Sequence, residues 1–318
     1  MNLASYLSLG QTALELGLIS GLTVLALFLS YSMLNVCDLS TDGCFTLGAA
    51  VGAAVAISGH PYLSLPAAML AGMLSGLITA VLQTRMGVNS LLAGIIVNTA
   101  LYSVNIAVMG SASVMNINRN PPVFSLLQNA LKKSGVPFLE ALAPYHKLII
   151  ALLAVVLVVV FLSLFLRTRL GLAIRATGDN PDMVRSSSIN PVFTTTVGLV
   201  VANAFTGLSG CLLAEYNKSA SIDIGSGMVT VALASLLIGN VFVRKGGIPL
   251  MAVAAVLGSI VFRVVYTIAL QLNMPAFMLK AVSSVIVVLA ISGPYLKQQW
   301  PVMARKLGLK DREAKKHA

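Results

Sequence analysis

The segment "LRTRLGLAIRATGDNPDMVRSSSINP", residues 166–191, is a charged stretch inside an otherwise apolar chain. The run before it, "LIIALLAVVLVVVFLSLFL" (148–166), and the run after it, "VFTTTVGLVVANAFTGLSGCLL" (192–213), contain no charged residue. An α-helix needs about 20 apolar residues to cross a bilayer. The two runs therefore predict membrane helices, and the segment between them predicts a polar connector at one membrane surface.

The composition of the whole chain agrees with this interpretation. Of 318 residues, 57% are hydrophobic and 10% are charged, whereas soluble domains carry about 25% charged residues. The sequence thus predicts an all-α, polytopic transmembrane helical bundle in one domain, residues 1–318. We expect nine spans, of which the second and seventh are short. They are about 14–34, 43–58, 62–82, 90–110, 146–166, 193–215, 228–243, 249–270 and 276–295.

Basic residues concentrate on one side of these spans. With 166–191 in the cytoplasm, the inside set has 14 members and the outside set 5, and cytoplasmic loops are the ones that carry such an excess. The N-terminus is therefore expected outside and the C-terminus in the cytoplasm. The inside set is Arg85, Arg167, Arg169, Arg175, Arg185, Arg244, Lys245, Lys297, Arg305, Lys306, Lys310, Arg312, Lys315 and Lys316, and the outside set is Arg119, Lys132, Lys133, Lys147 and Lys218.

The net charge of +11 follows from this topology, so nucleic acid is excluded as a partner. The basic tail, 296–318, is expected to contact anionic membrane lipid. In the longest outside loop, "PPVFSLLQNALKKSG" (121–135) predicts a short amphipathic helix. That helix either lies on the membrane surface or forms a lid or docking surface.

Two stretches of the chain resemble each other. "CDLSTDGCFTLGAA" (37–50) is echoed by "IDIGSGMVTVALA" (222–234), and each follows a long span and precedes a short one. The spans that precede the two copies are five apart, an odd number, so the copies enter the membrane from opposite sides. This predicts an inverted repeat, as in many transporters, with a first half at about 14–110 and a second at about 193–295.

Polar residues inside the spans define a candidate translocation path. A charged group in lipid is costly, so Asp38 is expected to face a wet cavity rather than lipid. We expect non-helical breaks at Asp38 and Asp223, and we expect Asn98, Asn105 and Asn203 to face the bundle. The candidate path residues are Asp38, Ser40, Asp42, Asn98, Asp223 and Asn240.

The connector, residues 167–191, is expected to be compact. Residues 167–176 continue the preceding helix, and Gly178 ends it as a cap with positive φ. Asp179 or Asn180 then begins a short helix with Pro181 at its first position and Asp182 in its first turn. Asn190 and Pro191 repeat this start for the next span. Two such turns predict a rigid helix parallel to the membrane.

This connector resembles the cytoplasmic coupling loop of ABC importer permeases of the branched-chain amino acid and ribose type. "CDLSTDG" is similar to a stretch of the sugar members, and "ASLLIGNVFVRKGGIPLMAVAAVLGS" (234–259) resembles a later glycine-rich stretch, with Asn240 in place of one glycine. Ser188 stands where glycine is commoner. The matching connector residues are Arg167, Gly171, Arg175, Ala176, Gly178, Asn180, Pro181 and Ile189.

The resemblance implies a permease of the bacterial cell (inner) membrane that forms the path for a small polar solute, either as a homodimer or paired with a related permease. It also implies cytoplasmic ABC ATPase subunits and an extracytoplasmic substrate-binding protein. No Gly-x-x-x-x-Gly-Lys-Ser/Thr phosphate loop occurs in the chain, so if ATP drives transport, another subunit must bind it. An amino acid is the first expectation for the solute, with a sugar or nucleoside as alternatives. The expected ATPase-coupling residues are Arg175, Gly178, Asn180, Pro181, Asp182 and Ile189.

Two other classes remain as alternatives. An ion-coupled secondary transporter would also show an inverted repeat, although few ionisable residues lie within spans. Arg263 is one, and its role is either an internal polar pair or permeation. An intramembrane enzyme could bind Mg²⁺ through Asp38 and Asp42, but two carboxylates are a thin site. The three cysteines have neither metal-ligand nor disulfide spacing, so we expect no metal and no cofactor.

Overall fold

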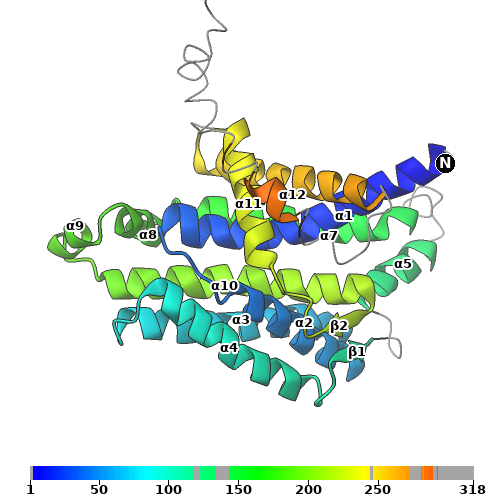
Figure 1. Ribbon diagram of the computed structural model, residues 1–318, viewed down its shortest axis with the longest axis horizontal. Helices are drawn as coiled ribbons and strands as arrows, with labels where there is room; N and C mark the ends of the chain where they lie inside the picture. The colour runs from blue at the N-terminus through cyan, green and yellow to red at the C-terminus, as the bar shows by residue number, and fades with distance from the viewer. Residues whose placement is uncertain are drawn as a thin grey trace, which may run out of the picture.

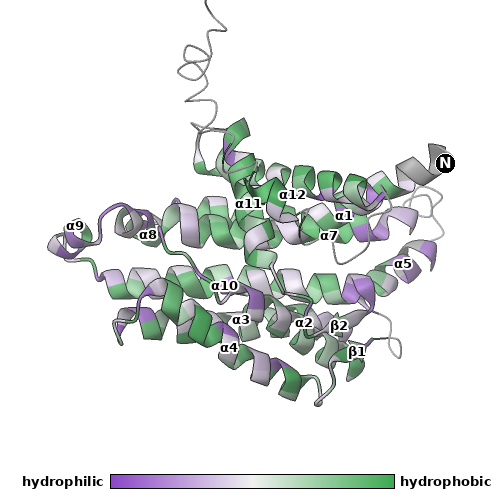
Figure 2. Cartoon of the chain, viewed as in Figure 1, coloured by the Kyte–Doolittle hydropathy of each residue, from purple (hydrophilic) through white to green (hydrophobic). Residues whose placement is uncertain are grey.

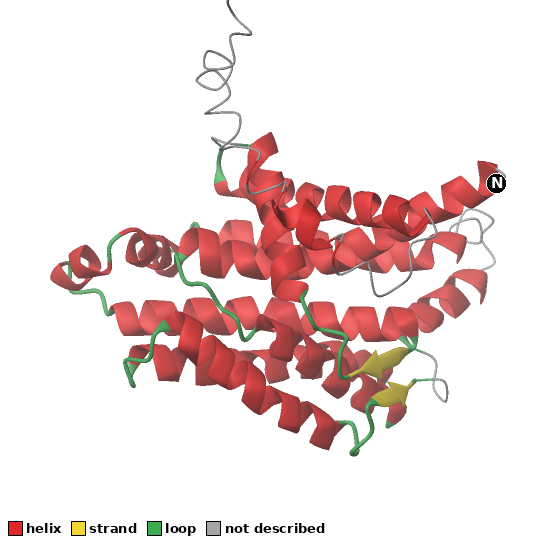
Figure 3. Ribbon diagram, in the orientation of Figure 1, coloured by secondary structure: helices red, strands yellow, loops and turns green. Residues whose placement is uncertain are grey.

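The computed structural model describes residues 3–117, 122–133, 143–243, 246–271, 281, 283–288 and 292. Helices make up most of this part of the chain, and a small two-stranded sheet lies at one end (Figure 3). Two short helices, α8 (Arg169–Asp179) and α9 (Pro181–Ser186), project at the opposite end (Figure 1). We call these the strand end and the connector end of the bundle.

The remaining elements run between these two ends. They are α1 (Leu3–Leu27), η1 (Phe28–Met33), α2 (Thr41–Ile57), α3 (Pro61–Thr84), α4 (Ser90–Val108), β1 (Val114–Asn116), α5 (Val123–Lys133), η2 (Ala143–Tyr145), α7 (His146–Phe165), α10 (Pro191–Asn217), β2 (Ser219–Ser221), α11 (Met228–Phe242) and α12 (Ile248–Gln271). Apolar residues cover most of the helical length, and polar residues gather in α5, α8 and α9 (Figure 2).

Six helices are long and apolar enough to cross a membrane: Ser8–Met33, Pro61–Thr84, Ser90–Val108, Ala143–Phe165, Pro191–Asn217 and Ile248–Ala269. The expected short spans are helices α2 and α11, which are apolar but below the length of a full crossing. The ninth expected span, 276–295, lies largely outside the described residues. The described chain is thus a polytopic helical bundle with six candidate spans, and the expected number of nine is not reached there.

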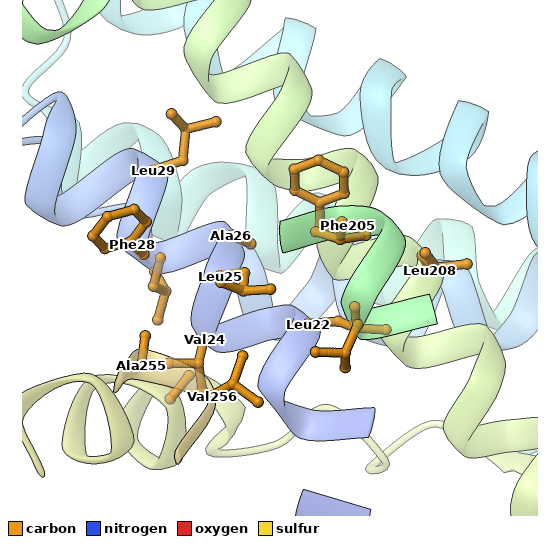
Figure 4. Close-up of a cluster of buried hydrophobic side chains, with 14 of the residues drawn as sticks. Leu22, Val24, Leu25, Ala26, Phe28, Leu29, Phe205, Leu208, Ala255 and Val256 are labelled. Carbon is orange, nitrogen blue, oxygen red and sulfur yellow. The ribbon is translucent and has the colours of Figure 1, made fainter. Parts of the chain in front are cut away.

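Helices α1 and α10 form the centre of the bundle. In the most apolar segment of each of these two helices, 83% of the residues are buried, against 22% in α7 and 28% in α4. α10 packs against α3, α2 and α1. Leu22 and Leu25 of α1 belong to one buried cluster with Phe205 of α10 and Val256 of α12 (Figure 4). The most apolar helix of the chain, α7, therefore lies at the periphery, where it can contact lipid.

Small residues allow the close packing of α10. A side chain on Gly72 of α3 would collide with the backbone carbonyl of Asn203, and one on Gly48 of α2 with the backbone of Gly207. Glycines at four-residue spacing, such as Gly72 and Gly76, permit this approach between membrane helices. The backbones of α2, α3 and α10 consequently lie almost in contact.

Both echoed stretches interrupt the helical structure, as the sequence predicts. The chain between η1 and α2, residues 34–40, is non-helical and contains Asp38, and Asn35 has a φ of 55° there. Residues 222–227, with Asp223, form turns before α11. Gly227 has a φ of 84°, a conformation that glycine adopts without strain.

The strand end joins two loops that are distant in sequence. β1 pairs antiparallel with β2, with Met115 opposite Ala220. The expected amphipathic helix is α5, and its Val123 N–H donates to the Glu215 carboxylate at the end of α10, at 3.0 Å. These contacts fix the loop after α4 against the end of α10.

Candidate functional site

Asp38 is a buried carboxylate that ties the non-helical stretch 34–40 to α10. Its side chain is 1% exposed. One oxygen accepts hydrogen bonds from the backbone N–H and the hydroxyl of Ser40, at 2.9 and 2.5 Å, and the other accepts from Asn203 Nδ2 at 2.7 Å. Thr79 of α3 donates to the Ser40 hydroxyl at 3.2 Å. These bonds replace the water that a carboxylate loses on burial.

Asp42 connects the two echoed stretches directly. Its carboxylate, in the first turn of α2, accepts from the backbone N–H groups of Gly227 and Val229 at 2.9 and 2.8 Å. These amides lie at the start of α11, where the helix dipole favours a negative charge. A side chain 185 residues away in sequence therefore acts as the N-terminal cap of α11.

A polar cavity of about 340 Å³ opens beside this contact. Asn105 in its wall is 1% exposed; its Nδ2 donates to the Gly43 carbonyl at 3.2 Å, and its Oδ1 is buried without a partner among the described residues. The lining residues are Asp42, Gly43, Thr46, Asn98, Thr99, Tyr102, Asn105, Ile222, Asp223 and Ser226. None of these side chains is basic, so the cavity offers mainly hydrogen-bond acceptors and hydroxyls.

The connector contains two helices with separate caps. α7 ends at Phe165, and Thr168 caps α8 by accepting from the Gly171 N–H at 3.2 Å. Residues 167–176 therefore do not continue the preceding helix, which corrects the sequence prediction, because the Thr168 hydroxyl offers a new start. The predicted starts with Pro181 and Pro191 are confirmed. Asn180 Oδ1 accepts from two N–H groups of α9, at 3.1 Å each, and Asn190 caps α10.

Gly178 does not end α8 with a positive φ, so that prediction is wrong. It is a helical residue of α8, which continues to Asp179, and its φ is not positive. A side chain there would collide with the carbonyl oxygen of Met33 and the backbone of Leu34. Glycine is needed at this position because α8 approaches the chain where η1 ends and the stretch containing Asp38 begins.

The outer face of the connector is exposed. Met183 of α9 is 68% exposed and Ile189 is 39% exposed, and Asp182 is also exposed, whereas Arg175 is partly buried. Val184 faces inward and is buried. The short helix thus anchors itself through one apolar side chain and presents its other side chains outward.

Comparison with known proteins identifies the family. The family described as "Branched-chain amino acid transport system / permease component" matches residues 11–291. The chain belongs to this permease family. It is the permease subunit of an ABC transport system, and such a system also has ATPase and binding-protein subunits. The family places it in a membrane as a transporter subunit and not an enzyme, and favours this class over an ion-coupled secondary transporter.

Several relatives cover most of the permease. A tyrosine transport system permease protein of Clostridioides difficile is 29% identical over 85% of this chain and 86% of its own length. An uncharacterized protein of Rickettsia prowazekii is 31% identical over 72% and 76%. A nucleoside ABC transporter permease protein of Lactococcus lactis is 26% identical over 65% and 64%. No solved structure matches the chain.

The predicted path residues of the permease fall into three places. Asp42, Asn98 and Asp223 line the same cavity. Asp38 and Ser40 belong to the buried network with Asn203. Asn240 is partly buried near the end of α11 and lines neither that cavity nor the Asp38 network.

The predicted orientation of the span amides is confirmed by burial. Asn105 and Asn203 are each 1% exposed, and Asn98 is partly buried in the cavity wall. The cavity is also lined by Thr99 and Tyr102, which were not predicted from the sequence. A signal was present, because positions 98, 102 and 105 are spaced four and three residues apart and so share one face of a helix.

The alternative of a two-carboxylate metal site gains no support in the permease. The described residues contain no group of three His, Cys, Asp or Glu side chains that could hold a metal. Asp38 and Asp42 are four residues apart, but the first bonds to Ser40 and Asn203 and the second to the start of α11. The two carboxylates thus have separate hydrogen-bonding roles.

Proposed function

We propose that the chain forms the solute path of an ATP-driven importer and that α8 and α9 dock on the ATPase. The observation that carries this proposal is the contact of Gly178 with Met33 and Leu34. Because α8 packs directly on Met33 and Leu34, a movement of the connector shifts the stretch 34–40 and with it the Asp38 network. Packed helices transmit such shifts because protein interiors yield little.

The orientation follows from the connector. Four arginines lie at 167, 169, 175 and 185, and cytoplasmic segments hold the excess of basic residues. The connector end is then cytoplasmic and the N-terminus external. Arg175, Gly178, Asn180, Pro181, Asp182 and Ile189 form the proposed coupling segment.

The proposed solute path runs past the two echoed stretches. It comprises Asp42, Asn98 and Asp223 around the cavity, with Asp38 and Ser40 behind it and Asn240 farther along α11. Side chains at the open side of the cavity are exposed, among them Tyr102 at 54%. Polar groups at membrane depth need cover from protein. A second copy of the chain, or a related permease, is the proposed cover, with lipid around the pair.

The domain organisation proposed is an inverted repeat of two halves, 14–110 and 193–295, with the connector 167–191 between them and the tail 296–318 after them. Its support is the helix pairing. In this repeat, α1, α2 and α3 of the first half correspond to α10, α11 and α12 of the second. The packed pair α1–α12 then corresponds to the pair α10–α3, and the packed pair α2–α10 corresponds to the pair α11–α1. The pairs α2–α3 and α11–α12 complete the correspondence. Exchanging the halves thus maps each of these contacts onto another.

We propose an amino acid as the solute and tyrosine as the first one to test, because a relative that covers most of the chain is named for tyrosine transport. A nucleoside is the second candidate, from the relative named for nucleosides. The lining of the cavity, with carboxylates and amides, can bind the ammonium group of an amino acid.

Uptake into proteoliposomes tests the transport proposal. The permease is reconstituted with the ATPase and the binding protein of its own transport system, and labelled tyrosine uptake is measured with and without ATP and an ionophore. We expect uptake to require ATP and to persist with the ionophore. Uptake that continues without ATP and stops with the ionophore would refute an ATP-driven importer.

Copurification of the ATPase tests the docking proposal. Met183→Ala removes the most exposed apolar side chain of α9 and is expected to weaken ATPase copurification. Tyr62→Ala, at the start of α3, is the control, because Tyr62 is similarly exposed, at 72% against 68%. Equal ATPase recovery with both variants would contradict docking through α9.

A further inference from the structure

Arg263 is a cation inside a candidate membrane span. It lies in α12, in the span Ile248–Ala269. Its Nε donates to the Ser20 hydroxyl of α1 at 3.3 Å, and its guanidinium carbon lies 5.6 Å from the ring centre of Tyr266. In the described part of the chain, no Asp or Glu is among its electrostatic neighbours. A charge within the membrane is expensive and marks a functional site by default.

Arg263 borders a second cavity, of about 330 Å³. Its wall combines the cation with hydroxyl side chains and contains no carboxylate among the described residues. The hydroxyl residues around Arg263 are Ser226, Thr230, Tyr266, Ser283 and Ser284. A guanidinium binds carboxylates through two parallel hydrogen bonds, so this wall fits a small carboxylate.

The start of α11 also borders this cavity, but its amides are already used. The N–H groups of Gly227 and Val229 donate to Asp42, and that of Met228 donates to the Gly225 carbonyl. The helix terminus therefore offers no free donor from these three residues. Arg263 is left as the charged donor that can hold an anion here.

The two cavities carry opposite charge on either side of one turn. Ser226 lines both. The first has the carboxylates of Asp42 and Asp223 and the Oδ1 of Asn105, which has no partner within the described part of the chain, and the second has Arg263. The turn 222–227 thus separates a wall that attracts cations from a wall that attracts anions.

We propose that Arg263 forms a carboxylate subsite of the solute path, and that the path sorts solutes by binding carboxylates on the Arg263 side and ammonium groups on the Asp223 side. The solute class it fits is one that carries both groups, such as a free amino acid. This inference rests on the proposed function, since it concerns the same path. It adds Arg263 as the residue that binds the carboxylate of the solute, and it assigns the ammonium group to the separate cavity that Asp223 lines.

Ligand-induced stabilisation of the permease–ATPase complex in nanodiscs, without binding protein, tests the subsite. The probes are L-alanine, propionate, which lacks the ammonium group, and ethylamine, which lacks the carboxylate. We expect propionate to raise the unfolding temperature of the wild-type complex. Arg263→Gln should lose the propionate shift and keep the ethylamine shift, and Asp223→Asn should show the reverse.

Two further variants separate this role from a structural one. Arg85→Gln removes the same charge at an exposed position outside both cavities and should keep every shift. Arg263→Lys keeps the positive charge but loses the paired N–H donors of the planar guanidinium, so it should retain a weakened propionate shift. This variant provides the test if the Arg263→Gln complex does not assemble.

Three outcomes would overturn the subsite. The first is the absence of a propionate shift in the wild-type complex. The second is an unchanged propionate shift in the Arg263→Gln complex. The third is an Arg263→Gln complex whose unfolding temperature without ligand is lower, while its response to propionate stays like that of the wild type, because this would indicate a purely structural role. Failure of the proposed function would look different, because the wild-type permease would then show no ATP-dependent uptake in proteoliposomes.

Discussion

Replacing Gly178 with alanine adds one methyl group at the contact between α8 and the stretch that precedes Asp38. The new Cβ would collide with the Met33 carbonyl oxygen and lie 2.9 Å from both Leu34 Cα and Leu34 C. All three are backbone atoms, so no side chain can rotate out of the way. The connector must therefore move relative to residues 33 and 34.

The magnitude follows from two opposing terms. Overpacking against atoms that cannot yield costs about 3 kcal/mol, the upper end of the usual range. Gly178 is helical, so alanine recovers about 1 kcal/mol of helix propensity. The net penalty is about 2 kcal/mol, which lowers the equilibrium constant for forming the native contact roughly thirtyfold. The α8 helix itself becomes more stable, and only its placement suffers.

The assay measures transport and ATP hydrolysis by the reconstituted complex. We expect the Gly178→Ala permease to reach the membrane, to copurify with the ATPase and to lose most solute uptake, while hydrolysis continues without transport. Gly59→Ala is the control. Gly59 has a φ of 94° and nothing within 4 Å of its position for a Cβ, so alanine there strains only the local backbone.

One result would refute the reasoning. If Gly178→Ala transports solute at the wild-type rate with a normal ratio of uptake to hydrolysis, the contact with Met33 and Leu34 does not transmit movement. The proposed coupling route would then be wrong even if α9 still docks on the ATPase.

Three further predictions concern the caps and the buried network. Asp42→Ala removes two charged hydrogen bonds from the start of α11 and should lower stability by about 3 kcal/mol, seen as a lower unfolding temperature, with Asp42→Asn intermediate. Asn203→Leu leaves the Asp38 carboxylate without one donor and should reduce the yield of folded protein. Adding Asp38→Asn to this variant should restore part of the yield. If the two substitutions instead lower the yield additively, the proposed hydrogen-bond network is contradicted. Asn180→Ala should destabilise the start of α9 by about 1 kcal/mol and weaken ATPase binding about fivefold, as measured by titration of the permease with the ATPase. Asn190→Ala, which removes the corresponding cap of α10, is the control and should leave ATPase binding close to wild type.

The sequence by itself determined the features that depend on neighbours within a few residues. Long apolar runs predicted the helices, because a span requires a minimum length of apolar chain. Asn180 and Asn190 predicted the starts of α9 and α10, because a cap bonds amides two or three positions away. The breaks at Asp38 and Asp223 followed from polar residues between apolar runs.

Only the tertiary structure decided which of these local features meet. Asp42 caps a helix 185 residues away, and Asp38 bonds Asn203 across 165 residues. The sequence suggested a left-handed Gly178, but the packing of α8 on Met33 requires a residue without a side chain in an ordinary helical backbone. Such contacts depend on which helix faces pack together, and helices with nearly uniform apolar surfaces carry little information about that choice in their own sequence.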